Sequence, residues 1–95
     1  PVHRAEDGMR VQPDHVYVIP PGAELTILHG ALLVWPAPTV TARRLPIDVF
    51  LQSLAKDARD HAVAVIFSGL GTDGALGVKM VMENFGLVMV QDPDT

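Results

Sequence analysis

The chain has 95 residues, 48% of them hydrophobic and 5% aromatic, so it can form at most one small domain with an aliphatic core. This composition favours a parallel sheet covered by helices over an aromatic-rich sandwich. The net charge of −4, basic residues that cluster only at Arg43 and Arg44, and the lack of cysteine argue against a nucleic-acid partner and exclude disulfides and thiolate chemistry.

The sequence contains no targeting or membrane signal. No apolar run approaches the ~20 residues of a membrane-spanning helix, and no signal peptide pattern is visible. A chain without cysteine fits a reducing compartment. We therefore expect a cytoplasmic protein without membrane insertion. Because it begins at Pro1 and stops at Thr95 just after a strand-like run, we also expect it to be a fragment of a longer polypeptide.

The first third of the chain predicts turns, a short strand and a hairpin. Residues 1–15 are polar and turn-rich, and the short strand at 16–19 is stopped by two prolines and a glycine. The apolar segments 24–28 and 31–35 then predict a β-hairpin. The two-residue connection between them, His29 and Gly30, suits a tight turn with positive φ. Residues 36–45 are expected to form a loop.

The rest of the chain alternates helix and strand patterns. A helix is expected from 46 to about 59, a buried strand at 62–66, a second helix at 75–85 and another strand at 87–90. The first helix has one apolar face, formed by Ile47, Phe50, Leu51, Leu54 and Ala55. The order predicts an α/β fold, doubly wound, with a mostly parallel sheet and an inserted β-hairpin. Two parallel strands do not form a stable sheet alone, so the domain is expected to be incomplete.

The loop at 67–74 is the strongest candidate for a functional site. It joins a buried strand to a helix start, where backbone N–H groups are free and the helix dipole is positive. One carboxylate, Asp73, lies within it. The loop-forming residues are Gly69, Gly71 and Gly74.

One interpretation of this loop is nucleotide binding. The glycines form a G-x-G-x-x-G pattern between strand and helix, and Asp92 follows the next strand, where an acid could bind a ribose hydroxyl. However, Asp73 would share the pyrophosphate position with a second anion, which is costly at low dielectric. A plainer interpretation is that Asp73 caps the helix that follows, since Asp is a favoured N-cap residue.

The loop also resembles a known enzyme family. Residues 65–77, V-I-F-S-G-L-G-T-D-G-A-L-G, resemble the last catalytic motif of the CheB-type chemotaxis protein-glutamate methylesterases. Segments 14–21, 45–50 with 53–55, and 91–95 are similar to that family in collinear order. Segment 5–9 fits particularly those members that are fused to a methyltransferase. The resemblance covers nearly the whole chain, so residues 1–95 are expected to be the carboxyl-terminal part of a methylesterase catalytic domain.

The resemblance implies a cytoplasmic Ser-His-Asp esterase without a cofactor, acting in chemotaxis and phosphorelay signalling. It would hydrolyse glutamate methyl esters and deamidate glutamines on the cytoplasmic domains of methylated chemoreceptors. Asp73 corresponds to the triad acid, which orients the histidine and stabilises the imidazolium. The N–H of Leu70 corresponds to the oxyanion donor. A receiver domain or a fused methyltransferase would be the partner within the full protein.

The nucleophile and base of this family have no counterpart in residues 1–95. Ser53 and Ser68 lie in matched motifs but not at the nucleophile position, and His15 is expected to be an exposed residue before a strand. The remaining histidines, none at metal-ligand spacing, are His3, His29 and His61. We therefore expect the isolated chain to be inactive.

Two further substitutions depart from the family pattern. Leu51 stands where the family usually has a second aromatic residue, and Phe85 where it tends to have glycine. Besides the esterase and the nucleotide-binding module, a third hypothesis is a non-catalytic interaction fragment, because unpaired strand edges invite self-association.

Overall fold

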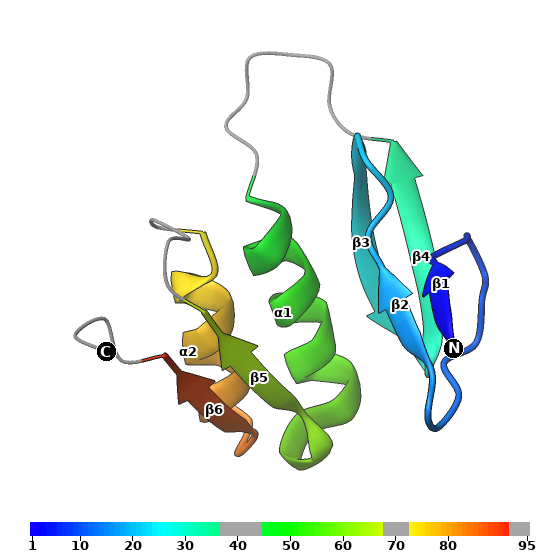
Figure 1. The fold of residues 1–95 in the computed structure, drawn as a ribbon. Coiled ribbons are helices and arrows are strands. Elements are labelled where there is room, and N and C mark those ends of the chain that lie inside the picture. The colour runs from blue at the N-terminus through cyan, green and yellow to red at the C-terminus, as the bar shows by residue number, and fades with distance from the viewer. Residues whose placement is uncertain (37–44, 68–72, 92–95) are drawn as a thin grey trace.

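The computed structural model describes residues 1–36, 45–67 and 73–91 (Figure 1). In chain order the elements are β1 (Val2–Arg4), β2 (Val16–Val18), β3 (Ala23–Leu28), β4 (Ala31–Pro36), α1 (Pro46–Ala58), the short 3-10 helix η1 (Arg59–His61), β5 (Val63–Ile66), α2 (Ala75–Glu83) and β6 (Leu87–Val90). Helix α1 lies in the middle, with β1 to β4 on one side and α2, β5 and β6 on the other (Figure 1). None of the helices in the described ranges has the length and apolarity to cross a membrane.

Helix α1 forms where its apolar pattern predicts it. Pro46 stands at the first helical position, where its missing N–H costs nothing, and Leu51 and Ala55 on the apolar face are buried. The helix ends at Ala58 because Arg59 leaves the helical region of backbone conformation, with φ 51° and ψ −118°. The predicted boundary is therefore confirmed to within one residue.

The hairpin is also confirmed. Strands β3 and β4 pair antiparallel around His29 and Gly30, whose φ values of 51° and 75° match the expected tight turn. One strand was not predicted: β1 pairs parallel with β2, placing His3 opposite Tyr17. Strand β1 has only three residues, which is too short for an alternating hydrophobic pattern to be recognised in a polar segment. It can be identified as a strand only from its pairing with β2.

The second half is an α/β unit, as predicted. Strands β5 and β6 pair parallel, with Val63 opposite Leu87 and Ile66 opposite Val90, and α2 connects them. Helix α2 ends at Glu83, two residues earlier than expected, because Phe85 takes a positive φ. The mixed α/β architecture with parallel strands and a hairpin agrees with the predicted fold class.

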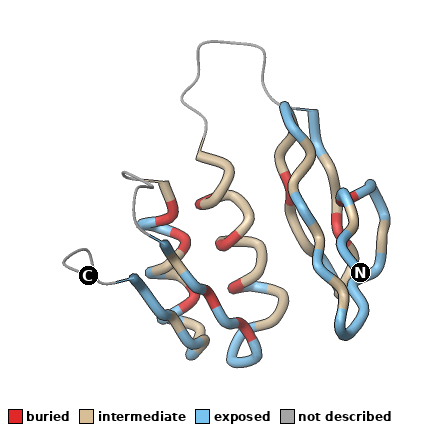
Figure 2. Tube along the Cα trace, in the orientation of Figure 1, coloured by how far each residue is buried: buried red, intermediate tan, exposed pale blue. Residues whose placement is uncertain are grey.

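Two apolar clusters hold these elements together. The buried residues of the first, between α1, α2 and β5, are Leu51, Ala55, Ala62, Ala64 and Val81. The second lies between the hairpin and the N-terminal segment and buries Ala5, Leu25 and Leu32. Phe50 packs against both clusters, so α1 joins the two halves. Figure 2 shows the buried positions on α1, α2 and β5, while β6 is mainly exposed.

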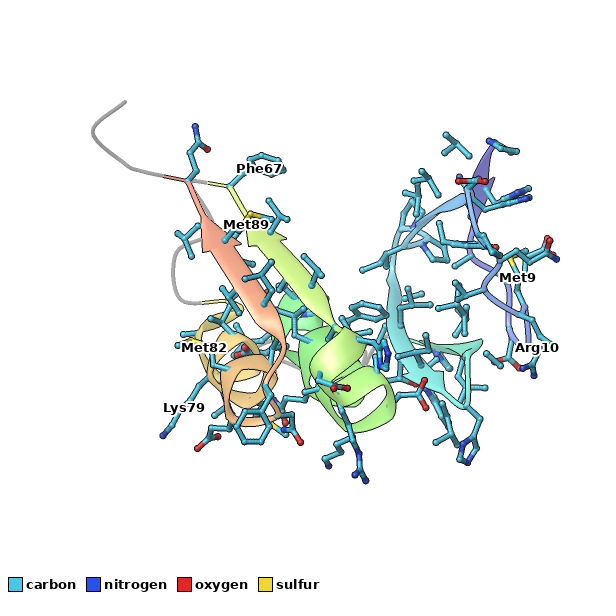
Figure 3. The ribbon with its side chains drawn as sticks, turned by 90° about the horizontal axis from the view of Figure 1, so that it is seen from below. Met9, Arg10, Phe67, Lys79, Met82 and Met89 are labelled. Atoms are coloured by element: carbon cyan, nitrogen blue, oxygen red, sulfur yellow. The ribbon has the colours of Figure 1, made fainter. Side chains whose placement is uncertain are left out.

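The β5–β6 pair leaves much apolar surface uncovered. Its exposed large side chains are Val63, Val65, Phe67, Leu87, Met89 and Val90. Phe67, at the end of β5, and Met89, on β6, both lie on this two-stranded pair in Figure 3. Lys79 and Met82 instead extend from α2 on the side away from α1 (Figure 3). The uncovered apolar strands agree with an incomplete domain.

Replacing Phe85 with Gly should stabilise the fold by about 0.5–1 kcal/mol. Phe85 adopts φ 68° with its side chain 85% exposed, so its ring contributes little packing while its Cβ strains the backbone. Gly relieves that strain, although the more flexible unfolded chain offsets part of the gain. Urea unfolding measures the difference. Phe85→Ala, which keeps the Cβ, should show no comparable gain; an equal gain would show that the exposed ring, not the backbone, is responsible.

Candidate active site

Asp73 lies in the turn before α2, half-buried, with its carboxylate directed at the start of α1. Its Oδ2 accepts a hydrogen bond from the N–H of Ile47 at 3.1 Å, and its Oδ1 accepts one from the N–H of Asp48 at 2.9 Å. These are the second and third residues of α1, so both donors belong to the helix N-terminus. The carboxylate is thus held by two bonds in one orientation.

Helix α1 needs such an external acceptor. Leu45 occupies the N-cap position without a side-chain hydrogen bond, and the first helical residue, Pro46, has no N–H. The two free amides that remain are satisfied by Asp73, which lies 25 residues beyond Asp48 in the chain. The negative carboxylate also meets the positive end of the helix dipole, which stabilises its charge.

The expectation that Asp73 might simply cap the helix that follows it is therefore wrong. The N-cap of α2 is Gly74, with φ 98° and no side-chain cap bond. A Cβ at Gly74 would also lie 3.1 Å from Cγ2 of Ile47, so the site demands glycine both for its φ and for the close approach to α1. Asp73 does cap a helix, but that helix is α1 and not the α2 helix that follows it.

A second carboxylate, Asp48, completes the arrangement. Its side chain is 5% exposed, and its Oδ1 accepts a hydrogen bond from the N–H of Gly77 at 2.8 Å. Gly77 is the third residue of α2, so an acid of α1 caps the start of α2, while the acid in the turn before α2 caps the start of α1. Asp48 was not predicted as a site residue from the sequence. An Asp three residues into a proline-initiated helix usually indicates local capping, and nothing local reveals its distant partner.

Several other candidate site residues are not among those that the structure describes. Leu70, Gly69 and Gly71, together with Ser68, lie outside the described residues, as does Asp92. The oxyanion assignment and the roles of these glycines therefore stay predictions.

Ser53, His3 and His15 make contacts that hold the fold together. Ser53 Oγ accepts the N–H of Ile27 at 3.1 Å and donates to the carbonyl of Phe50 at 2.7 Å, which ties α1 to β3. His15 is half-buried, 2.8 Å from a ring nitrogen of His3 and stacked near it, so the expectation of an exposed residue is wrong.

The two remaining histidines lie on exposed turns. His29 occupies the hairpin turn, and His61 ends η1 beside Asp60. Across residues 1–36, 45–67 and 73–91, no three His, Cys, Asp or Glu side chains gather closely enough to hold a metal ion.

The nucleotide alternative gains no support from this geometry. The N–H of Gly77 at the start of α2 is bonded by Asp48, and Asp73 lies in the turn that precedes it. A pyrophosphate there would face two carboxylates in a partly buried place. The two α1 amides use two of the about four lone-pair positions of the Asp73 carboxylate.

The fold is part of a doubly wound α/β domain, with one acid, Asp73, held in the turn before α2. The chain belongs to the CheB methylesterase family, whose sequence model matches residues 1–95. The crystal structure of the Thermotoga maritima CheB methylesterase catalytic domain superimposes with a TM-score of 0.77 at 29% identity. The match covers 97% of this chain and 51% of that one.

Curated relatives agree with this membership. Protein-glutamate methylesterase/protein-glutamine glutaminase from Photorhabdus laumondii is 35% identical over 95 residues, and that from Escherichia coli K12 is 37% identical. Each match covers 96% of this chain but 27% of the relative, so the chain spans about a quarter of those proteins. An uncharacterized 104.1 kDa protein of Rhodobacter capsulatus is 40% identical over 93 residues, 98% of this chain and 10% of that protein.

Proposed function

We propose that residues 1–95 are the carboxyl-terminal part of the catalytic domain of a protein-glutamate methylesterase, and that Asp73 is the acid of its Ser-His-Asp triad. The observation that carries the proposal is the fixation of Asp73 by two amides at the start of α1. A triad acid must hold one orientation, and the two N–H donors at the start of α1 fix the orientation of Asp73.

The proposed chemistry divides between this chain and a serine and a histidine from outside it. The histidine removes the serine proton as the hydroxyl attacks the glutamate methyl ester, then returns that proton to the leaving methanol. Water hydrolyses the acyl-enzyme in the same way, and the glutamate carboxylate is released. Asp73 accepts the hydrogen bond of the histidine Nδ1–H throughout, fixing its tautomer and stabilising the imidazolium. The N–H of Leu70 donates to the negative oxygen of each tetrahedral intermediate.

The substrates in this proposal are methylated chemoreceptor cytoplasmic domains, and the deamidation of receptor glutamines uses the same groups with ammonia as the leaving molecule. A receiver domain or a fused methyltransferase would act as a regulatory partner in the complete protein, in the cytoplasm. The names of the curated relatives, which combine methylesterase and glutaminase, support this pair of activities.

The experiment is an assay of methanol release from a methylated receptor domain. Residues 1–95 alone should release none above background, because the chain lacks the nucleophile and base. The complete catalytic domain should release methanol at a rate that a serine-directed phosphonate abolishes. Activity of the 95-residue chain alone, or of the complete domain after phosphonate treatment, would contradict the proposal.

A further inference from the structure

We propose that Asp48 is a positioning residue for catalysis, holding Asp73 in its working orientation; this inference depends on the triad role proposed for Asp73. Asp48 is 5% exposed, and a buried carboxylate is costly unless it is well hydrogen-bonded. Its Oδ1 accepts the N–H of Gly77 at 2.8 Å in a buried contact. The side chain is therefore committed to the start of α2.

The two acids form a closed ring of interactions. The backbone N–H of Asp48 donates to Oδ1 of Asp73 at 2.9 Å, while its side chain accepts from Gly77. Gly77 follows Asp73 by four residues, so the chain between them closes the ring. Consequently, the position of the Asp73 carboxylate depends on where α2 begins, and Asp48 fixes that point against α1.

The packing at the ring leaves little freedom. A Cβ at Gly77 would lie 2.5 Å from Cβ of Leu51, and one at Gly74 would lie 3.1 Å from Cγ2 of Ile47. The backbone at the start of α2 thus lies directly against side chains of α1. When the bond from Asp48 is lost, Gly77 is left with an unsatisfied buried N–H, and the α2 start must shift to find another acceptor. That shift moves Asp73 relative to the amides that orient it.

This role makes a kinetic prediction for the complete catalytic domain. Asp48→Ala should lower kcat for ester hydrolysis about 10²-fold, the size of effect that a displacement of about 1 Å produces at a catalytic group. KM should change less than about 3-fold, because neither acid contacts the substrate in this proposal. A purely structural residue would reduce the amount of folded enzyme without lowering kcat per folded molecule.

A double-mutant cycle with Asp73→Asn separates positioning from a general loss of stability. If Asp48 acts through Asp73, Asp48→Ala should cost less than about 3-fold in kcat once Asp73 is already replaced. A loss of the same 10²-fold size in both backgrounds would overturn the inference. So would a folded Asp48→Ala enzyme with kcat within 2-fold of the parent.

Asp57 supplies the matched control. It lies on the same helix, and its carboxylate also accepts two backbone amides, those of His29 and Gly30 in the hairpin turn. Asp57→Ala should lower stability but leave kcat per folded molecule within 2-fold. A 10²-fold loss there would show that any damage to α1 disables the enzyme, which would overturn the specific role of Asp48.

A second variant decides the matter if Asp48→Ala does not fold. Asp48→Asn keeps an oxygen for the Gly77 N–H but loses the stronger, charge-assisted bond, so kcat should fall several-fold in the parent and not in the Asp73→Asn background. An equal loss in both backgrounds, or none in either, overturns the inference. A different result would contradict the proposed function: an Asp73→Asn enzyme that retains its turnover.

Discussion

Asp73→Asn in the complete catalytic domain should lower kcat for methyl-ester hydrolysis by about 10⁴, the loss that the same change causes in the serine protease triad. The reason is geometric. Asn carries one oxygen and one NH2 group where two N–H donors of α1 now meet two carboxylate oxygens. Its oxygen turns to one amide, and the NH2 group cannot accept from the histidine, which then adopts the wrong tautomer.

Asp57→Asn is the control for this experiment. It makes the same chemical change on α1, at a carboxylate that also accepts two backbone N–H groups. Turnover per folded molecule should stay within 2-fold of the parent, with circular dichroism confirming that both variants fold. If Asp73→Asn retained kcat within 10-fold of the parent, Asp73 would not be the triad acid.

Gly77→Ala should destabilise the domain by about 2 kcal/mol, although helix propensity alone predicts a gain of about 1 kcal/mol. The added methyl group would sit 2.5 Å from Cβ of Leu51 and 3.3 Å from the carbonyl oxygen of Asp48. Neither atom can rotate away, so α2 must move from α1. Urea unfolding gives the free-energy change, and its sign separates the two effects.

Lys79→Ala is the control for the effect of introducing alanine into α2 at a position without steric overlap. Lys79 is exposed on the same helix and extends away from α1 (Figure 3), so its replacement should change stability by less than about 0.5 kcal/mol. Since Gly77→Ala also displaces the turn that carries Asp73, it should reduce turnover together with stability. A stability gain at position 77 would contradict the close packing of the two helix starts.

Elements with a long, regular pattern were predictable from the sequence. The five apolar positions of α1 and the hairpin turn at His29 and Gly30 place those elements within a residue or two. Strand β1 was missed because its three residues gain their identity only by pairing with β2. Helix α2 stops early because Phe85 enters a left-handed conformation that propensity does not reveal.

The site was predictable only in part. Asp73 stands out because a lone acid among glycines follows an apolar strand, and the family resemblance assigns its role. Its partners could not be read from the chain, because a cap is normally sought a few residues away and the amides of α1 come from a different helix. The bond from Gly77 to Asp48 is hidden for the same reason: it depends on two helices meeting where one has no side chain.

The capping of α1 by Asp73 also bears on how the enzyme is assembled. The groups that orient this acid all lie within residues 47–77, so this chain alone fixes the direction of the carboxylate. The exposed apolar side chains of β5 and β6 offer a surface against which further strands of the domain can pack. In the proposed triad, the histidine would therefore meet an acceptor whose orientation this chain has already fixed.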